Sequence, residues 1–285
     1  MRHFTGFVLS IIAVFGLCVP AFADGAPKRV ITVGAPATEI VFALGAGDSV
    51  IATDTTSTRP DPVPDLPKVG YMRNLASEGI IGLNPDLIVA VEKTGPDVVL
   101  GELRDLGIPI VILPSLAKME NLPGAIVMTG DALDKAEPAK TLSDRVQDDL
   151  AQLQGNNSAD RPSIVFLMAV GHGKPMSAGQ ETTADEIITM IGGVNSMAGF
   201  DGFKPVSPEV IASDASDYVL VTRSTIDQLG GLDGLQAHPI LGLNKAVANG
   251  RVLAISASTI LGFGPSSAKE IRDLAAHLRA IEQGS

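Results

Sequence analysis

Tryptophan is absent from the 285-residue sequence, cysteine occurs once, and the remaining aromatic residues are two tyrosines and nine phenylalanines. A single cysteine excludes a disulfide framework, a cysteine-rich zinc module and an iron–sulfur cluster. There are four histidines, none of them paired at i and i+4, which argues against a dedicated zinc or manganese carrier. Because aromatic side chains are scarce, each tyrosine is a candidate for a specific task.

Positive charge is also scarce. The 21 lysines and arginines are outnumbered by 32 aspartates and glutamates, which leaves a formal net charge of −11. Proteins that bind the phosphate backbone of nucleic acids carry the opposite excess, so we expect no nucleic-acid partner. The sequence also lacks a Gly-x-Ser-x-Gly elbow, a complete dinucleotide fingerprint and a phosphate-binding loop. No nucleophile–base pair is recognisable, and we therefore expect a protein that is not an enzyme.

Residues 1–23 have the layout of a secretory signal peptide. Arg2 supplies the positive amino-terminal region, and residues 7–19 form an apolar run shorter than a membrane span. Ala21-Phe-Ala23 is a small-x-small cleavage pattern, so we expect export and cleavage near Ala23.

Two alternatives are open for this segment. A membrane anchor would be followed by a basic stop-transfer flank, which the sequence lacks. A lipoprotein would be attached through Cys18, but the preceding Phe15-Gly-Leu17 departs from the small residues of a lipobox. Cleavage near Ala23 removes the only cysteine, so the exported protein must be stabilised by a hydrophobic core, for which its length suffices.

Short β-rich runs alternate with helical stretches in the first half of the chain. Residues 54–68 form a proline-rich loop between them. The alternation predicts an α/β fold with a mostly parallel sheet. The expected strands are 29–33, 50–53, 87–91 and 108–113, and the expected helices are 38–44, 74–83 and 96–106.

A longer helix is predicted from Glu137 to Gln154, because Leu142, Val146 and Leu150 share one face at helical spacing. After it the α/β pattern restarts, with a strand at 163–169, and it ends in a helix at 266–282. The division that follows is a signal peptide (1–23), an N-terminal lobe (24–136), a connecting helix (137–157) and a C-terminal lobe (158–285).

Three short patterns of the first lobe recur in the same order in the second. Glu39-Ile with Gly45 is repeated by Glu186-Ile with Gly192, and the runs beginning at Glu78 and at Ile110 are repeated from Glu209 and from Val252. Any two α/β halves have some sequence patterns in common, but three patterns that recur in the same order indicate two similar Rossmann-like lobes. A ligand cleft is expected between them.

Tyr71 lies in the run Lys68-Val-Gly-Tyr-Met-Arg-Asn74, at the end of the proline-rich loop. Loops on rigid scaffolds often carry function. A phenolate is a hard oxygen donor for ferric iron and a known haem ligand. It requires the phenol pKa of about 10 to fall, which a neighbouring cation such as Arg73 favours. The alternative is that Tyr71 only packs over the loop.

Several motifs resemble the periplasmic binding proteins for haem, vitamin B12 and siderophores. The opening run 29–48 is similar to the start of that superfamily, and 67–80 with 83–88 look like its haem (hemin) branch. The second lobe has further similarity to this branch at residues 176–179, 182–185, 192–193, 229–235 and 261–265.

The resemblance implies a periplasmic protein of two lobes joined by one long helix, which carries ferric haem to an ABC-transporter permease. An outer-membrane haem receptor would act upstream. In the haem branch Gly-Tyr-x-Arg carries the axial tyrosine, which corresponds to Tyr71 with Arg73. Similar proteins dock to arginines of the permease through one acidic residue on each lobe, and the matching positions are Glu78 and Glu209. The alternative is that both glutamates are solvated residues favoured by the helix dipole.

Further haem contacts are expected from both lobes. His172, in a glycine-rich loop, matches a histidine that some relatives use toward a second haem or the far face of the iron. Three methionines could approach the porphyrin, although methionine usually fills space; they are Met72, Met168 and Met176. The candidates for the two propionates, chosen by charge and loop position, are Arg59, Lys174 and Arg223.

Two other functions are weighed against haem transport. A corrinoid or ferric-siderophore binding protein of the same superfamily would need several aromatics or several cations in the cleft. An exported hydrolase or haem-degrading enzyme would need a catalytic pair that the sequence does not display.

Overall fold

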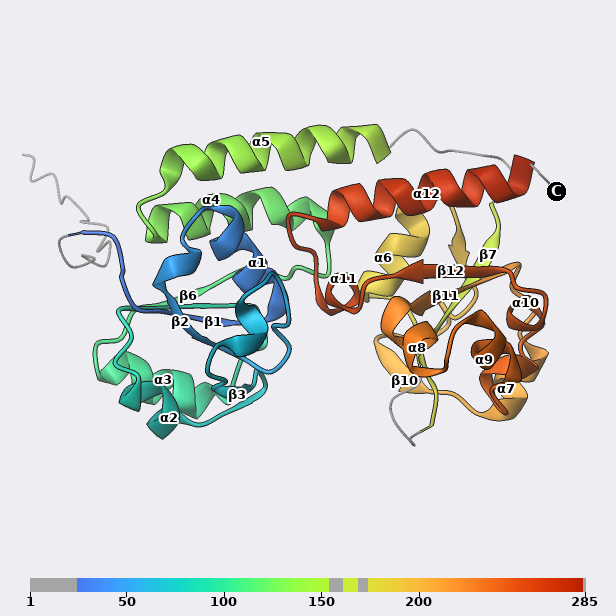
Figure 1. The fold of residues 1–285 in the computed structure, drawn as a ribbon, viewed down its shortest axis with the longest axis horizontal. Coiled ribbons are helices and arrows are strands. Elements are labelled where there is room, and N and C mark those ends of the chain that lie inside the picture. Colours follow the sequence, from blue (N-terminus) through green and yellow to red (C-terminus); the bar gives the residue numbers. More distant parts are fainter. Residues whose placement is uncertain (1–24, 154–160, 169–173, 284–285) are drawn as a thin grey trace, which may run out of the picture.

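The computed structural model describes residues 25–153, 161–168 and 174–283. Two α/β lobes lie side by side, and two long helices run along one side of the molecule (Figure 1). These helices are α5 (Ala136–Leu153) and α12 (Ser267–Gln283). None of the helices in the described ranges is long and apolar enough to cross a membrane.

The N-terminal lobe is built on a fully parallel sheet with the strand order β2-β1-β5-β6. Every residue of β1 and β5 is buried, as expected for parallel strands with helices on both faces. The strands are β1 (Val30–Val33), β2 (Val50–Thr53), β5 (Leu87–Ala90) and β6 (Ile110–Ile112). Helices α1 (Ala35–Ala43), α4 (Leu122–Ala132) and α5 pack toward one face, and α2 (Ser77–Gly82) and α3 (Asp97–Asp105) toward the other.

The C-terminal lobe has a mixed sheet in the order β10-β8-β7-β11-β12, and β9 also pairs with β7. Strands β8 and β10 are antiparallel, while β9, β7, β11 and β12 are parallel. The strands are β7 (Ser163–Met168), β8 (Met176–Ala178), β9 (Val194–Asn195), β10 (Phe203–Pro205), β11 (Tyr218–Thr222) and β12 (Val252–Ile255). The helices that precede α12 are α6 (Thr183–Met190), α7 (Pro208–Ser213), α8 (Arg223–Gln228), α9 (Leu232–Ala237), α10 (Lys245–Ala248) and α11 (Ala257–Leu261).

The parallel part of the second sheet repeats the first. The order β9-β7-β11-β12 has the same connectivity as β2-β1-β5-β6. An aspartate before the third strand also has the same task in both lobes. Asp86 accepts hydrogen bonds from the backbone N–H groups of Lys28 and Arg29, and Asp217 accepts them from the N–H and hydroxyl of Ser163.

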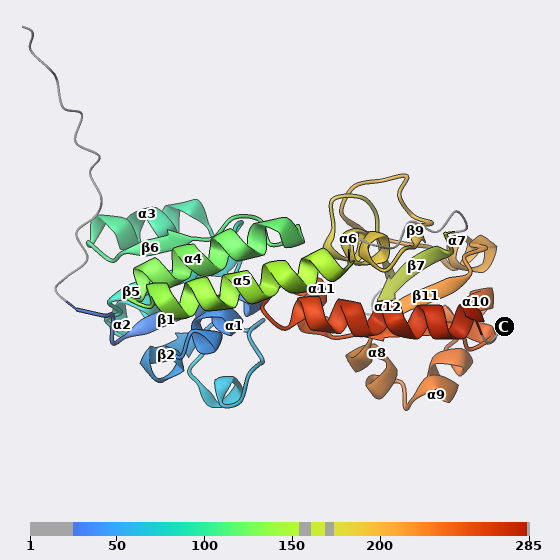
Figure 2. The same ribbon diagram turned by 90° about the horizontal axis from the view of Figure 1, so that it is seen from above.

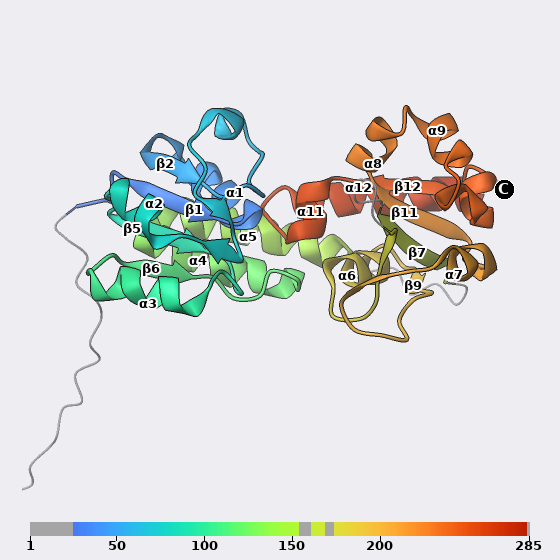
Figure 3. The same cartoon turned by 90° about the horizontal axis from the view of Figure 1, so that it is seen from below.

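One apolar core continues through both lobes on the side of the long helices. It joins one face of each sheet to α1, α4 and α5 of the first lobe and to α6, α11 and α12 of the second. Figure 2 shows α5 and α12 lying over the two lobes, and the Arg272 guanidinium donates to Asp149 at 2.8 Å between these helices. The opposite sheet faces, seen from below in Figure 3, pack against separate cores.

The boundary between the lobes is also hydrogen-bonded. The backbone N–H of Phe263 donates to the carbonyl of Leu116 at 2.8 Å, and that of Ser266 donates to Glu39 Oε1 at 2.6 Å. These bonds fix the chain between α11 and α12 against the N-terminal lobe.

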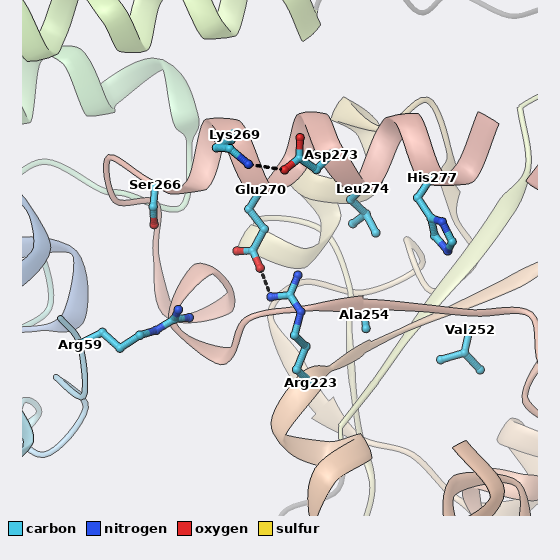
Figure 4. Close-up of a pocket in the computed structure, with 10 residues that line it drawn as sticks. All are labelled: Arg59, Arg223, Val252, Ala254, Ser266, Lys269, Glu270, Asp273, Leu274 and His277. Atoms are coloured by element: carbon cyan, nitrogen blue, oxygen red, sulfur yellow. Dashed lines mark hydrogen bonds and ion pairs between the residues drawn. The ribbon is translucent and has the colours of Figure 1, made fainter. Parts of the chain in front are cut away.

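A partly buried carboxylate on α12, that of Glu270, orders the start of α11. Glu270 accepts hydrogen bonds from the Ser256 N–H (2.8 Å), the Ser256 hydroxyl (2.7 Å) and the Thr259 hydroxyl (2.5 Å), and it pairs with Arg223 (Figure 4). Burial on its own raises the pKa of Glu270, but the hydrogen bonds from Thr259, Ser256 and Arg223 outweigh it and hold that pKa below its ordinary value. The Glu270 carboxylate therefore fixes the segment whose last residues are Ile260 and Leu261.

Most of the predicted elements are confirmed, and the fold class is the predicted one. Two differences concern the first lobe. Asn74 and Leu75 form a strand instead of the first turn of a helix, because they pair with the preceding Gly70-Tyr71. Helix α4, which the sequence analysis left without an assignment, is apolar on most of its circumference, since α1 and α5 both pack against it.

The continuous core predicts that the lobes unfold together. With no tryptophan in the chain, Tyr218→Phe leaves Tyr71 as the reporter of the first lobe, and Tyr71→Phe leaves Tyr218 as the reporter of the second. We expect coincident urea midpoints by tyrosine fluorescence. Leu278→Ala, at a 1% exposed core position, is expected to lower the stability reported by both tyrosines by about 2–5 kcal/mol.

The control for that experiment is Leu106→Ala, since Leu106 is 60% exposed and its truncation leaves no cavity. Two separate midpoints, or a loss confined to the Tyr218 signal, would contradict a shared core.

The lowered pKa predicts how the contribution of Glu270 depends on pH. Because the folded pKa lies below the unfolded value of about 4.3, the stabilisation is complete above that value and is lost as pH falls through the folded pKa. We expect Glu270→Gln to cost about 1–3 kcal/mol at pH 7 in urea unfolding. The difference from the wild type should shrink below pH 4.

Asp273→Asn, on the exposed side of the same helix, should leave the unfolding midpoint nearly unchanged. A Glu270→Gln difference that stays constant between pH 7 and pH 3 would show that the charge of this carboxylate is not what stabilises α11.

Candidate ligand-binding site

Tyr71 is presented by a short antiparallel hairpin. The hairpin consists of β3 (Gly70–Tyr71) and β4 (Asn74–Leu75), with Met72 and Arg73 at its turn. The backbone of Gly70 has φ +102°, in the region that favours glycine. Leu75 is buried below the hairpin, while Tyr71 is 47% exposed above it.

Backbone bonds attach this hairpin to the chain before α3. The N–H of Gly95 donates to the carbonyl of Met72 at 2.9 Å, and the N–H of Leu75 donates to the carbonyl of Gly95 at 3.0 Å. Backbone hydrogen bonds to Gly95 therefore fix both sides of the turn that follows Tyr71.

The proline-rich loop before the hairpin is ordered around the ammonium of Lys68. Its Nζ donates to the Thr53 hydroxyl (2.7 Å) and to the carbonyls of Val63 (2.9 Å) and Ser57 (3.0 Å). Partial burial lowers the pKa of Lys68, and the charge of Asp54 partly offsets this effect. Three oxygens of the loop are thereby held by one cation.

The buried Asp54 fixes the other end of the loop. Its carboxylate accepts hydrogen bonds from the backbone N–H groups of Gly34 and Thr56, both at 2.9 Å. It also accepts from the hydroxyls of Thr56 (2.5 Å) and Ser57 (2.6 Å). The loop therefore leads from β2 to the hairpin along a defined path despite its lack of regular structure.

A cavity of about 380 Å³ lies between the hairpin and the C-terminal lobe. From the first lobe it is lined by Tyr71, Met72 and Arg73, and by Glu92 and Lys93 beyond β5. The second lobe supplies an apolar wall opposite them, formed by Phe203, Ile260 and Leu261, together with the polar side chains of Glu181, Thr182 and Thr183.

A second cavity, of about 310 Å³, adjoins the first on the side of the C-terminal lobe. The two cavities share four lining residues: Arg73, Phe203, Ile260 and Leu261. Both volumes lie in the range of small-molecule sites, roughly 300–1,000 Å³.

The other tyrosine is not available to a ligand in this cleft. Tyr218 is 5% exposed within β11, and its ring lies 6.0 Å from the Arg251 guanidinium. Burial raises the pKa of its phenol. Among the described residues, no group of three or more His, Asp or Glu side chains could hold a metal ion. Tyr71 is therefore the phenol that lines the cleft, alongside the carboxylates of Glu92 and Glu181.

The predicted site residues separate into two groups. Tyr71, Met72 and Arg73 share the 380 Å³ cavity, and Met168 lines the second one. Lys174 is exposed and Met176 half-buried, and neither lines these two cavities. His172 lies outside the described residues.

Arg59 and Arg223 lie elsewhere, in a groove of about 510 Å³ beside α12 (Figure 4). Arg223 is paired with Glu270, and the Arg59 guanidinium donates to the Ser258 hydroxyl across the lobe boundary at 3.0 Å. His277 also lines this groove, and the half-buried His238 accepts through Nδ1 from the N–H groups of Ile240 and Leu241.

Glu78 and Glu209 are exposed, each in the first turn of a short helix. Hydrogen bonds from Ser207 and from its own backbone lower the pKa of Glu209. Helices α2 and α7, which carry them, lie on the side of the molecule opposite α5 and α12, one on each lobe (Figure 1).

The apolar wall of the cleft was not predicted from the sequence. Phe203 is one of few phenylalanines outside the first 23 residues, so the scarcity that singled out Tyr71 also pointed to it. Ile260 and Leu261 carried no such signal, because their position depends on Glu270 and on the hydrogen bond from the Thr183 hydroxyl to the Ile260 carbonyl.

Solved structures of haem-binding proteins are similar to this chain. The periplasmic haem-binding protein RhuT of Roseiflexus sp. RS-1, in apo form, is 31% identical with a TM-score of 0.79, over 87% of this chain and 97% of RhuT. The periplasmic haem-binding protein BhuT in complex with two haems is 32% identical with a TM-score of 0.77, over 88% of this chain and 99% of BhuT.

A curated relative points to a different ligand. The vitamin B12-binding protein of Vibrio campbellii is 27% identical over 232 residues, which are 79% of this chain and 82% of that protein. The family model for periplasmic binding proteins matches residues 30–259, so the match takes in strands of both lobes. The chain therefore belongs to the periplasmic binding protein family, and it is a substrate-binding protein and not an enzyme.

Proposed function

We propose that the protein captures ferric haem in the cleft between its lobes and delivers it to an ABC-transporter permease for haem or iron uptake. The observation that carries the proposal is the half-exposed Tyr71, which lines a cavity together with the apolar side chains of Phe203, Ile260 and Leu261 from the other lobe. Haem is a flat apolar ring with iron at its centre, and it needs both features. The likeness to RhuT and BhuT, at 31% and 32% identity, supports this ligand.

Tyr71 binds the iron through its phenolate in this proposal. Arg73 lines the same cavity and brings a positive charge to it. Phe203, Ile260 and Leu261 exclude water from the porphyrin on the other side. His172 remains a predicted contact to a second haem or to the far face of the iron.

A corrinoid is the second candidate ligand, because the curated relative from Vibrio campbellii binds vitamin B12. A corrinoid brings its own axial ligand and amide side chains, so it makes no use of an unpaired phenol. Ligand-dependent stabilisation separates the candidates, since the true ligand raises the melting temperature with its concentration. Haem, cyanocobalamin and a ferric siderophore form the panel.

Delivery requires contact with the membrane partner. Glu78 and Glu209 are the proposed docking carboxylates, because they are exposed on the same side of the two lobes (Figure 1). The acidic balance of the chain fits a basic rim on the permease. Export through a signal peptide cleaved near Ala23, and an outer-membrane receptor upstream, belong to the same proposal.

The tyrosine ligand is tested by a hemin titration of the purified protein. The wild type should give a tyrosinate-type ferric absorption spectrum, and Tyr71→Phe should lose it together with at least about tenfold in affinity, or 1.4 kcal/mol. Tyr218→Phe is the matched control, because the Tyr218 ring is buried away from the cleft. An unchanged spectrum and affinity in Tyr71→Phe would refute the ligand assignment.

Docking is tested by charge reversal. Glu78→Lys and Glu209→Lys should each lower haem uptake into cells at least about tenfold, because a cation would then face the basic rim. Haem affinity should stay within about twofold, since neither residue lines the cleft cavities. Glu137→Lys is the control, in the first turn of α5 on the opposite side of the molecule. Uptake that falls equally in the control would count against these two positions.

A further inference from the structure

The second cavity has a different chemistry from the cleft that it adjoins. One part of its lining is polar and consists of Thr222, Ser224, Thr225 and Gln228, at the end of β11 and along α8. Arg73 is the one charged side chain among its described lining residues. The cavity thus combines hydroxyl and amide groups with a single positive charge and with apolar side chains such as Phe203 and Leu261.

The polar groups of this lining are held in place by one another. The hydroxyl of Thr222 lies 2.8 Å from that of Thr225 and 3.0 Å from that of Ser224. Gln228 is exposed, and within the described part of the chain its amide has no hydrogen-bond partner. The Gln228 amide therefore has donor capacity that these residues do not use up, and the Ser224 hydroxyl donates to a ligand when it accepts in its bond with Thr222.

The cleft around Tyr71 is less suited to an anion. It is lined by two carboxylates, Glu92 and Glu181, one from each lobe, alongside the cations Arg73 and Lys93. A ligand with a negatively charged edge would meet like charge there. The adjoining cavity offers that edge Arg73 without any carboxylate among the described lining residues.

We propose that the second cavity receives the carboxylate edge of the ligand whose iron is bound by Tyr71, with Arg73 as the ion-pair partner and Ser224 and Gln228 as hydrogen-bond donors. This inference rests on the proposed function and gives the ligand one orientation: iron over the hairpin and carboxylates toward α8. Arg73 lines both cavities and so lies at the boundary between these two parts of the ligand.

The position of Arg223 agrees with this assignment. It precedes Ser224 in the chain, but its guanidinium lies in the groove beside α12, where Glu270 neutralises it (Figure 4). Arg223, the cation nearest to Ser224 in the sequence, therefore serves to order α11. The proposed ion-pair partner of the ligand carboxylates is Arg73, from the N-terminal lobe.

The test compares two iron porphyrins, ferric protoporphyrin IX and its dimethyl ester, which lacks the two negative charges. The variant is the double substitution Ser224→Ala with Gln228→Leu, and the matched control is Gln147→Leu on the exposed face of α5. We expect the double variant to lose about tenfold or more in affinity for the diacid, because two groups that hydrogen-bond to a charged carboxylate are removed. Its affinity for the diester should change less than about threefold.

Each outcome decides between the two proposals. An equal loss for both porphyrins, or no loss for either, overturns the carboxylate assignment, while the wild type still binds hemin with a tyrosinate spectrum. If the wild type binds neither porphyrin but binds cyanocobalamin, the proposed function fails instead. Circular dichroism of the double variant checks that α8, which is exposed at both positions, has kept its fold.

Discussion

The apolar core beneath α5 and α12 is the constraint on which the rest of the molecule depends. Two lobes joined by one helix could rotate against each other, but here side chains from both sheets and from six α-helices form one cluster. Hydrogen bonds from Phe263 and Ser266 to the first lobe close the same boundary. The relative position of the lobes is therefore part of the fold. The same packing sets the width of the cleft on the other side of the molecule.

The two walls of the cleft are held in place by two separate sets of hydrogen bonds. On the first lobe, one ammonium and one carboxylate, those of Lys68 and Asp54, order a loop that has no regular structure. On the second lobe, Glu270 fixes the start of α11 and with it the apolar side chains at the end of that helix. None of these three charged side chains lines the cavity around Tyr71, but the segments that they order carry side chains that do.

The parts of this arrangement that repeat along the chain could be predicted from the sequence. Buried strands such as Leu87–Ala90 read as apolar runs, and Asp86 and Asp217 mark the same point in both lobes, so periodicity and repetition led to the α/β lobes. Tyr71 was identified because tyrosine is scarce and because its neighbours form a motif. Arg223 illustrates the limit: its charge and loop position suggested a ligand contact, but its partner, Glu270, lies 47 residues away. Pairings across such distances depend on the folded chain. The strand formed by Asn74 and Leu75 was missed for a different reason, because a two-residue hairpin with Gly70 and Tyr71 is too short to show a periodic pattern.

A cleft whose walls are fixed before the ligand arrives has a consequence for the energetics of transport. Little conformational entropy remains to be lost on binding, so the affinity is not reduced by the ordering of loops or by domain closure. The same preorganisation works against release, because opening the cleft by moving the lobes apart would separate side chains of the core that they share. Under the proposed function, a partner that unloads the carrier would have to supply the free energy of that separation.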